Sequence, residues 1–250
     1  MIDIAHSVAR ENCDWLELVT DYRGLLRARE KNKMSMILSI ENGIVMGDDL
    51  LYLRNFYRLG VRLMSLTWNY RNQLGDGVGC ANARRGLSAF GREVLREMER
   101  LGIIVDVSHL NERTFWHVVE ATDGPVVATH SNAFNLCKHP RNLTDSQIRA
   151  IADRNGFIGL NFCNAFLSDS DKASAHDVVK HARHIAEVGG IQVLAIGSDF
   201  DGIVTAPVGL EHIGKMTKLI AALRKAGFSQ ADIEAISHKN FLRVFRAVCG

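Results

Sequence analysis

The sequence predicts an α/β fold in which parallel strands alternate with helices. Short, almost wholly apolar runs rich in β-branched residues recur along the chain; each begins after a glycine or polar turn and leads into a segment of helical period. The six runs are Met36–Glu41, Val61–Trp68, Ile103–His109, Val126–His130, Phe157–Phe162 and Val193–Asp199. This alternation implies βαβ units with right-handed crossovers.

The intervening segments carry helix start and stop signals. Ser88–Leu101 begins at a serine, has a Glu- and Arg-rich face and stops at Gly102. Asn111 and Thr144 are N-cap candidates for the next two helices. The other helices are predicted over Asn111–Ala121, Thr144–Arg154, Ala173–Val188, Lys215–Ala226 and Ser229–Val248, the last as two helices. Ahead of the first run, Ile2–Val19 is predicted as helix.

Length and composition favour one globular domain over residues 1–250. The chain is 47% hydrophobic and 23% charged, which allows a large core. With 30 basic and 28 acidic residues and no basic block, nucleic acid is excluded as a partner. No apolar run could cross a bilayer and the first residues are too polar for a signal peptide, so the chain as it stands is expected in the cytoplasm. Its five scattered cysteines predict reduced thiols.

Ionisable residues close four of the predicted strands. They are Glu41, His109, His130 and Asp199. Because the carboxyl ends of parallel strands lie on one face, these side chains should converge, and imidazole with carboxylate is the ligand set of a catalytic zinc. Taken singly, each has a simpler interpretation as a capping or hydrogen-bonding group, and Asp199 in GSDFDG could belong to a tight turn. Four such residues in one repeating pattern favour a metal site.

Two loop features and the remaining histidines complete the candidate set. Arg141, in the loop after the fourth strand, is suited to hold a carboxylate by a bidentate pair, with a solvated loop arginine as the alternative. The glycine-rich loop Asn69–Leu87 follows a strand, where substrate contacts are expected. Surface or capping roles are predicted for His6, His117, His139, His176, His181, His184, His212 and His238.

From near its N-terminus to its end, the chain resembles the membrane dipeptidase (renal dipeptidase) family of zinc metallopeptidases. The densest matches are SIENG, GREVLREMERLGIIVDVSH, PVVATHSNAFNLCKHPRN, IGSDFDG and KNFLRVFRAV, and their combination is specific. The resemblance implies a (β/α)8 TIM-type barrel with two Zn²⁺ ions. It also implies hydrolysis of dipeptides, including some with a C-terminal D-residue, by a metal-activated water.

The resemblance also implies a role for each candidate residue. Glu41 is similar to the carboxylate that bridges both metals, and His109 and His130 to the two imidazole ligands of one zinc. Arg141 is similar to the residue that grips the terminal carboxylate of the substrate. Asp199 is similar to the acid/base that handles the proton of the attacking water.

The chain departs from the family in two respects. The His-x-Asp pair of the family's first strand is not found, and about six of eight strands are visible. We therefore expect a single barrel domain lacking its first strands, with one zinc or fewer and impaired activity, or a homo-oligomer that covers the gap. Secondly, Trp68 stands where some members carry a histidine that is thought to stabilise the tetrahedral intermediate.

Two other functions remain open at this point. The chain could be a catalytically inactive relic that binds metal or a partner. It could also be a different metal-dependent amidohydrolase, acting on a cyclic amide or lactone. The role of Arg141 separates the last reading from the dipeptidase, because only a substrate with a terminal carboxylate needs that side chain.

Overall fold

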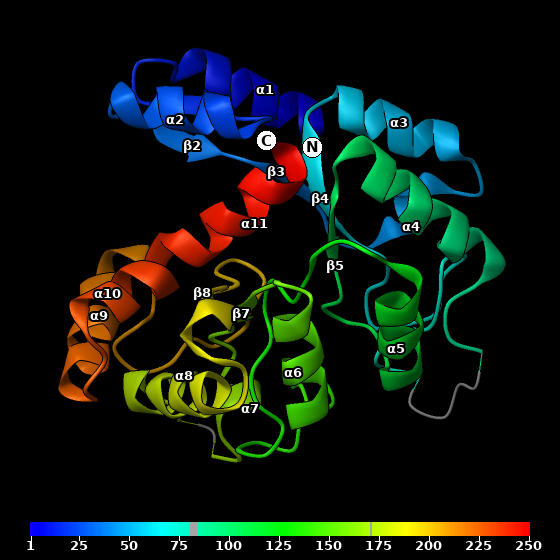
Figure 1. The fold of residues 1–250 in the computed structure, drawn as a ribbon. Coiled ribbons are helices and arrows are strands. Elements are labelled where there is room, and N and C mark those ends of the chain that lie inside the picture. Colours follow the sequence, from blue (N-terminus) through cyan, green and yellow to red (C-terminus); the bar gives the residue numbers. More distant parts are fainter. Residues whose placement is uncertain (81–84, 171) are drawn as a thin grey trace. The chain divides into compact units, whose positions relative to one another are not determined.

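The computed structural model describes residues 1–80, 85–170 and 172–250, in which strands and helices alternate (Figure 1). The chain divides into two compact units. The first unit is Met1–Pro125 together with Leu242–Gly250, and the second unit is Val126–Phe241. A single domain over residues 1–250 stays a prediction, and each unit is described by itself.

The first unit contains most of the strands. Its elements in chain order are α1 (Ile2–Glu11), β1 (Leu16–Leu18), α2 (Tyr22–Glu30), β2 (Met34–Met36), β3 (Leu38–Ile40), the 3₁₀ turn η1 (Gly43–Met46), α3 (Leu50–Arg58), β4 (Val61–Ser65), α4 (Ala89–Leu101), β5 (Ile104–Asp106) and α5 (Glu112–Ala121), with most of α11 (Asn240–Cys249).

Strands of the first unit pair in parallel. β3 pairs with β4, with Ile40 opposite Met64, and β4 pairs with β5, with Met64 opposite Val105. Met64 and Val105 are buried, as expected for strands covered on both faces. The three strands predicted over this part of the chain are therefore confirmed, and their carboxyl ends lie at one edge of the sheet.

The helix predicted over Ile2–Val19 is wrong in its second half. α1 ends at Glu11, and β1 follows, paired in parallel with β2. The backbone of this segment is hydrogen-bonded across the pair, because Met34 N–H donates to Trp15 O (2.7 Å) and Val19 N–H donates to Met36 O (2.8 Å). This tertiary pairing overrides the local helical period. With β1 and β2, which were not predicted, the described residues hold eight strands.

Helix caps in the sequence are used as predicted. Ser88 Oγ accepts a hydrogen bond from Gly91 N–H (2.8 Å) at the start of α4, and Gly102 ends this helix in the left-handed conformation (φ 79°). Asn111 caps α5, and Thr144 caps α6 (Asp145–Asp153) in a capping box. These caps fix where each helix begins relative to the strand that precedes it.

The second unit carries the remaining strands between long helices. Its elements are β6 (Val126–Val127), α6, β7 (Ile158–Leu160), α7 (Asn164–Leu167), α8 (Ala175–Gly189), η2 (Ile191–Val193), β8 (Leu194–Ile196), η3 (Ile213–Lys215), α9 (Met216–Lys225), α10 (Gln230–Glu234), the π-helical turn η4 (Ala235–Lys239) and the start of α11.

Strands of the second unit also run in parallel. β7 pairs with β8, with Ile158 opposite Leu194, and a parallel bridge joins Ala128 to Ile158. The three strands predicted here are confirmed. The predicted division of Ser229–Val248 into two helices is confirmed as well. The π-helical turn separates α10 from α11, and Asn240 then donates to Leu194 O (2.7 Å), which ties α11 to β8.

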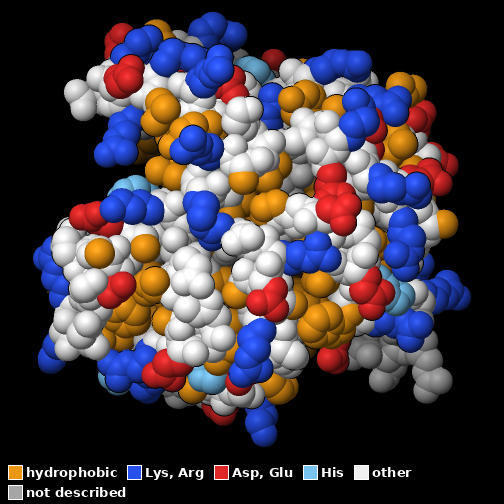
Figure 2. All heavy atoms as spheres, viewed as in Figure 1, with side chains coloured by type: hydrophobic (Ala, Val, Ile, Leu, Met, Phe, Trp, Pro, Cys, Tyr) orange, Lys and Arg blue, Asp and Glu red, His pale blue; other side chains and the backbone are white. Residues whose placement is uncertain are grey.

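The surface carries both signs of charge. Figure 2 shows Lys and Arg side chains interspersed with Asp and Glu over the face in view, which agrees with a net charge of +2. None of the helices in residues 1–80, 85–170 and 172–250 combines the length and apolar character needed to cross a membrane.

His181, predicted as a surface or capping residue, is instead buried in the second unit. Its side chain lies on the inner face of α8, and the residue is 1% exposed. Nδ1 accepts a hydrogen bond from Ala133 N–H (3.0 Å), and Nε2 donates to Leu167 O (3.1 Å). Burial lowers the pKa of His181 to about 4, so the imidazole is neutral in the folded protein.

We expect this histidine to make stability depend on pH. Its folded pKa of about 4 lies below its ordinary value of 6.5, so between these values the unfolded chain binds more protons. The stabilisation is complete above pH 6.5 and is lost as the pH falls toward 4, with a loss of about 2 kcal/mol by pH 5. Urea unfolding at several pH values measures it.

The matched variants are His181→Gln and His176→Gln. Both histidines lie on α8, but His176 is exposed, so its replacement should leave the pH dependence of the wild-type protein in place. His181→Gln should flatten that dependence between pH 7 and 5. Equal slopes for the wild-type protein and His181→Gln would contradict the assignment.

Candidate active site

Glu41 and His109 meet at the carboxyl edge of the sheet in the first unit. Glu41 directly follows β3, and His109 lies three residues beyond β5. His109 Nε2 approaches Glu41 Oε1 at 2.8 Å, with the imidazole 8% exposed and the carboxylate 49% exposed. Two of the residues predicted from the sequence are therefore in contact, one buried and one open to solvent.

Asn69 sets the orientation of the His109 ring. Its Oδ1 lies 2.9 Å from His109 Nδ1, so that Nδ1 donates and the ring presents Nε2 toward Glu41. An imidazole that binds a metal usually donates its other N–H to an oxygen in this manner. Asn69 follows β4, the strand between β3 and β5, so the loop from the central strand supports the contact.

This arrangement fits a cation. With Nδ1 protonated, Nε2 and the carboxylate oxygen are both acceptors, and two acceptors 2.8 Å apart repel unless a proton or a cation lies between them. Zn²⁺ binds imidazole nitrogen and carboxylate oxygen at about 2.0–2.2 Å, so both atoms of Glu41 and His109 could contact one ion without moving apart.

The backbone of His109 is held in an uncommon conformation. Its φ is 68°, in the left-handed region that disfavours a non-glycine residue. Val78 N–H donates to the His109 carbonyl (2.7 Å) and Thr67 Oγ1 lies 3.4 Å from it, so the neighbouring loop fixes this conformation. Such outliers gather at functional sites, where the surrounding structure over-determines them.

His130 follows β6 in the second unit. Its Nδ1 lies 2.7 Å from Thr129 Oγ1, and the residue is buried. The adjacent carbonyl of Thr129 is pressed against two glycines. A Cβ at Gly159 would lie 2.0 Å from Thr129 O, and a Cβ at Gly197 would lie 1.8 Å from it. Only glycine, which carries a hydrogen in place of Cβ, fits at these distances. The ends of β6, β7 and β8 can approach this closely because glycine occupies both positions.

Arg141 is 6% exposed, so the alternative of a solvated loop arginine is wrong. Nη2 donates to the carbonyl of His130 (3.2 Å), and the guanidinium lies 5.5 Å from the centre of the Phe166 ring. The loop after β6 therefore places the buried guanidinium of Arg141 beside the backbone of His130, a predicted metal ligand.

Two amide side chains organise the residues around Asp199. Asn161, the residue after β7, donates from Nδ2 to Asp199 Oδ2 (3.0 Å). Asn132 and Asn161 are fully buried and exchange two hydrogen bonds, Asn132 Nδ2 to Asn161 O (2.9 Å) and Asn161 N to Asn132 Oδ1 (3.2 Å). Asp199 has a left-handed φ of 60°, so its side chain is held by a tight turn as well as by Asn161.

The charges of Arg141 and Asp199 both act on Cys163, which places these two predicted residues in one neighbourhood of the second unit. The pKa of the Cys163 thiol is raised, mainly by burial and further by the Asp199 carboxylate, while Arg141 opposes the rise. Burial, with a smaller contribution from Arg141, lowers the pKa of His139. His139 Nδ1 accepts from Arg141 N–H (3.2 Å), which requires the unprotonated nitrogen.

Sequence reasoning missed the amides that support the charged residues. Asn69 and Asn161 follow strands, as the predicted residues do, but a search for ionisable strand ends passes over amides. The predicted substrate loop Asn69–Leu87 supplies the first of them, although its residues 81–84 lie outside the described residues. Their positions after strands could have revealed these amides, but the search was limited to ionisable residue types.

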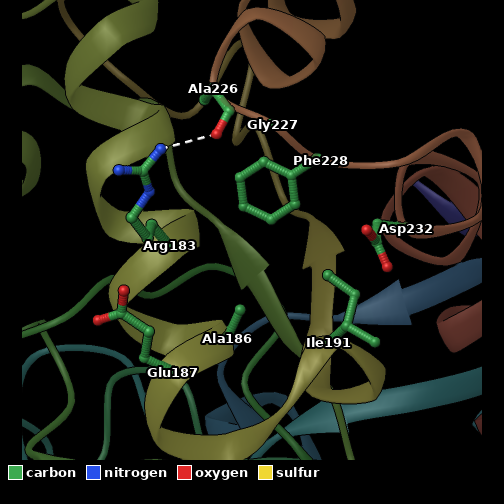
Figure 3. Close-up of a pocket in the computed structure, with 8 residues that line it drawn as sticks. All are labelled: Arg183, Ala186, Glu187, Ile191, Ala226, Gly227, Phe228 and Asp232. Atoms are coloured by element: carbon green, nitrogen blue, oxygen red, sulfur yellow. Dashed lines mark hydrogen bonds between the residues drawn. The ribbon is translucent and has the colours of Figure 1, made fainter.

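A separate hollow in the second unit contains none of the predicted residues. It measures about 340 Å³ and is lined by Arg183, Ala186, Glu187, Ile191, Ala226, Gly227, Phe228 and Asp232. In Figure 3 the Phe228 ring lies between the Arg183 and Asp232 side chains, and Arg183 donates to Ala226 O (2.7 Å). This hollow is formed by α8 and the turn from α9 to α10, not by the strand ends.

Comparison with known proteins identifies a family for this chain. Residues 1–249 match the family model described as membrane dipeptidase (peptidase family M19). A protein of Klebsiella pneumoniae, described as uncharacterized and lying in the pqqA 5′ region, is 38% identical over 255 residues, which cover 98% of this chain and 92% of that protein.

Solved structures agree with the family match. Dipeptidase AC, a metallopeptidase of family M19, is 30% identical with a TM-score of 0.94, covering 100% of this chain and 76% of that one. A metallopeptidase from Rhodobacter sphaeroides, liganded with a phosphinate mimic of L-Ala-D-Ala, is 30% identical with a TM-score of 0.91, covering 98% and 73%. An amidohydrolase from Pseudomonas aeruginosa is 27% identical with a TM-score of 0.93, covering 100% and 83%.

Parallel α/β architecture with a carboxylate and an imidazole at the strand ends is typical of metal-dependent hydrolases. Within that class, this chain belongs to the membrane dipeptidase family, peptidase family M19. It is thus a metallodipeptidase by family, and the family implies a metal cofactor.

If His109 is a zinc ligand, we expect Asn69→Ala to lower the affinity for zinc by about 10–100-fold, the usual cost of removing the partner of a ligating histidine. The His109 ring would lose the acceptor that fixes Nδ1–H. Competition against a chromophoric chelator measures the affinity. Asn69→Asp keeps an acceptor and should retain most of it, and the control Asn55→Ala changes an exposed asparagine of α3. Equal affinities for Asn69→Ala and Asn55→Ala would exclude this role.

Proposed function

We propose that this chain is a zinc dipeptidase in which Glu41, His109 and His130 bind the metal. The observation that carries the proposal is the 2.8 Å approach of His109 Nε2 to Glu41 Oε1 at the carboxyl ends of β3 and β5. His130 occupies the corresponding position after β6 and adds a second buried imidazole. One carboxylate and two imidazoles form a ligand set suited to Zn²⁺.

A zinc ion bound by these residues would act as a Lewis acid and would lower the pKa of its water to about 7, the chemistry needed for attack on a peptide carbonyl at neutral pH. The protein residues hold the ligands in place beforehand. Asn69 fixes His109 through Nδ1, and Thr129 contacts His130 at Nδ1, so in both imidazoles Nδ1 has a protein partner. Both supports favour binding through Nε2.

Arg141 is proposed to bind the terminal carboxylate of the dipeptide. A buried guanidinium offers parallel N–H donors to a carboxylate, and desolvation strengthens this pairing. Its contact with the His130 carbonyl fixes the side chain close to a proposed ligand. Recognition of a free carboxylate would select dipeptides over longer chains extended at that end and over cyclic amides or lactones.

Asp199 is proposed to carry the proton. It accepts a proton from the attacking water and delivers it to the leaving amine, which must be protonated to depart. Asn161 holds one carboxylate oxygen, and Gly202 leaves room for the other, since a Cβ there would lie 2.3 Å from Asp199 Oδ1. The orientation of the carboxylate is thus set before a substrate binds.

The number of zinc ions bound per chain tests the proposed ligand set. With Glu41, His109 and His130 as ligands, we expect about one zinc per chain. Elemental analysis of protein purified with added zinc measures it, and size-exclusion chromatography on the same sample gives the oligomeric mass. His109→Ala should lose the zinc, whereas the exposed control His176→Ala should keep it. About two zinc ions per chain would overturn the single-site expectation, and none would overturn zinc binding itself.

Activity on Xaa-D-Ala dipeptides tests the reaction and the role of Arg141. Arg141→Ala should raise KM for free dipeptides by about 10–100-fold, because hydrogen bonds to a charged group contribute about 1.5–3 kcal/mol each. The same variant should barely change KM for dipeptide amides, and Arg149→Ala, at an exposed position of α6, is the matched control. An equal change for free and amidated dipeptides would contradict carboxylate recognition, and no turnover at any zinc level would contradict the dipeptidase.

A further inference from the structure

We infer that Trp68 contacts the side chain of the N-terminal residue of the dipeptide and gives the enzyme a preference for apolar and aromatic residues there. The inference rests on the proposed dipeptidase function. Trp68 lies three residues beyond β4, the strand between those that lead to Glu41 and His109. It therefore stands at the edge of the sheet where the proposed metal ligands meet.

The indole lies beside the proposed metal ligand. Its ring centroid is 6.0 Å from that of His109, with an interplanar angle of 34°. The residue is nevertheless 46% exposed, although tryptophan usually buries a large area in the folded state. An exposed indole next to a candidate catalytic group provides apolar surface that a substrate can cover.

The loop that carries Trp68 is fixed by backbone contacts. A Cβ at Gly77 would lie 2.1 Å from Trp68 O, so this loop returns against its own start at a distance only glycine permits. Gly79 N–H donates to Asn69 O (2.6 Å), and Val78 N–H donates to His109 O (2.7 Å). The backbone that carries Trp68 is thus fixed relative to His109, which lowers the conformational entropy that this loop loses when a ligand binds.

The position of the indole indicates which side chain it meets. The carbonyl attacked during dipeptide hydrolysis belongs to the N-terminal residue, and it must lie near the proposed ligands Glu41 and His109. The side chain of that residue branches from the carbon next to this carbonyl, two bonds from the carbonyl carbon, whereas the terminal carboxylate is three bonds away. We therefore assign the exposed face of Trp68, which lies beside His109, to the N-terminal side chain. An uncharged aromatic surface favours Leu or Phe over Gly at this position.

The test compares Gly-, Ala-, Leu- and Phe-D-Ala as substrates of the zinc-loaded enzyme. For the wild-type protein we expect kcat/KM to rise along this series. Trp68→Ala should reduce the ratio of kcat/KM for Phe-D-Ala to that for Gly-D-Ala about tenfold, mainly through KM, because an aromatic pair and its apolar contact are lost. Trp68→Phe should restore most of the ratio.

Trp15→Ala is the matched control. Trp15 is also exposed (51%), but it precedes β1, at the opposite ends of the parallel strands, so its replacement should leave both the ratio and the activity unchanged. An unchanged ratio in Trp68→Ala, or an equal loss on all four substrates, would overturn the inference.

Failure of the inference and failure of the proposed function give different results. If the wild-type enzyme hydrolyses none of the four dipeptides, the proposed function fails. Binding of phosphinate mimics of Gly-D-Ala and Phe-D-Ala, measured by calorimetry, then decides the role of Trp68 without turnover. Tighter binding of the Phe mimic that disappears in Trp68→Ala supports the inference, and equal binding of both mimics to the wild-type protein overturns it.

Discussion

The contact between Glu41 and His109 depends on the parallel register of three strands. β3, β4 and β5 run side by side, so the residues that follow β3 and β5 reach the same edge although 68 positions separate them in the sequence. The loop that follows β4, the strand between them, supplies Asn69 to the ring of His109. The helix caps of the first unit support this geometry, because Ser88 and Asn111 fix where α4 and α5 begin relative to the strands before them.

Neutral polar side chains perform the corresponding task in the second unit. Asn132 and Asn161 exchange hydrogen bonds in the interior, and Asn161 also donates a hydrogen bond that orients the Asp199 carboxylate. His181 remains neutral and supports the backbone at Ala133, three residues after His130. Buried polar groups that are fully hydrogen-bonded specify a single arrangement, since any slip leaves a donor or acceptor unsatisfied.

The six predicted strands are all present, because each is an apolar run bounded by a turn, a signal that needs no partner. β1 and β2 were not predicted. Trp15–Leu18 is not an apolar run bounded by a turn, and only its pairing with Met34–Met36 makes it a strand. The contact of Glu41 with His109 followed from strand ends alone. The amides Asn69 and Asn161 could not be predicted in this way, because an uncharged side chain acquires its role from the neighbour it meets.

Trp68 and Asn69 are consecutive residues, and this adjacency limits how the enzyme could be altered. One loop conformation sets both the indole surface that we infer to face a ligand and the support of a histidine, with the glycines at 77 and 79 closing the loop on itself. Grafting a loop from a relative, or changing its length, would therefore shift both properties together. Redesign of selectivity is better confined to the indole itself, with the backbone of the loop left as it is.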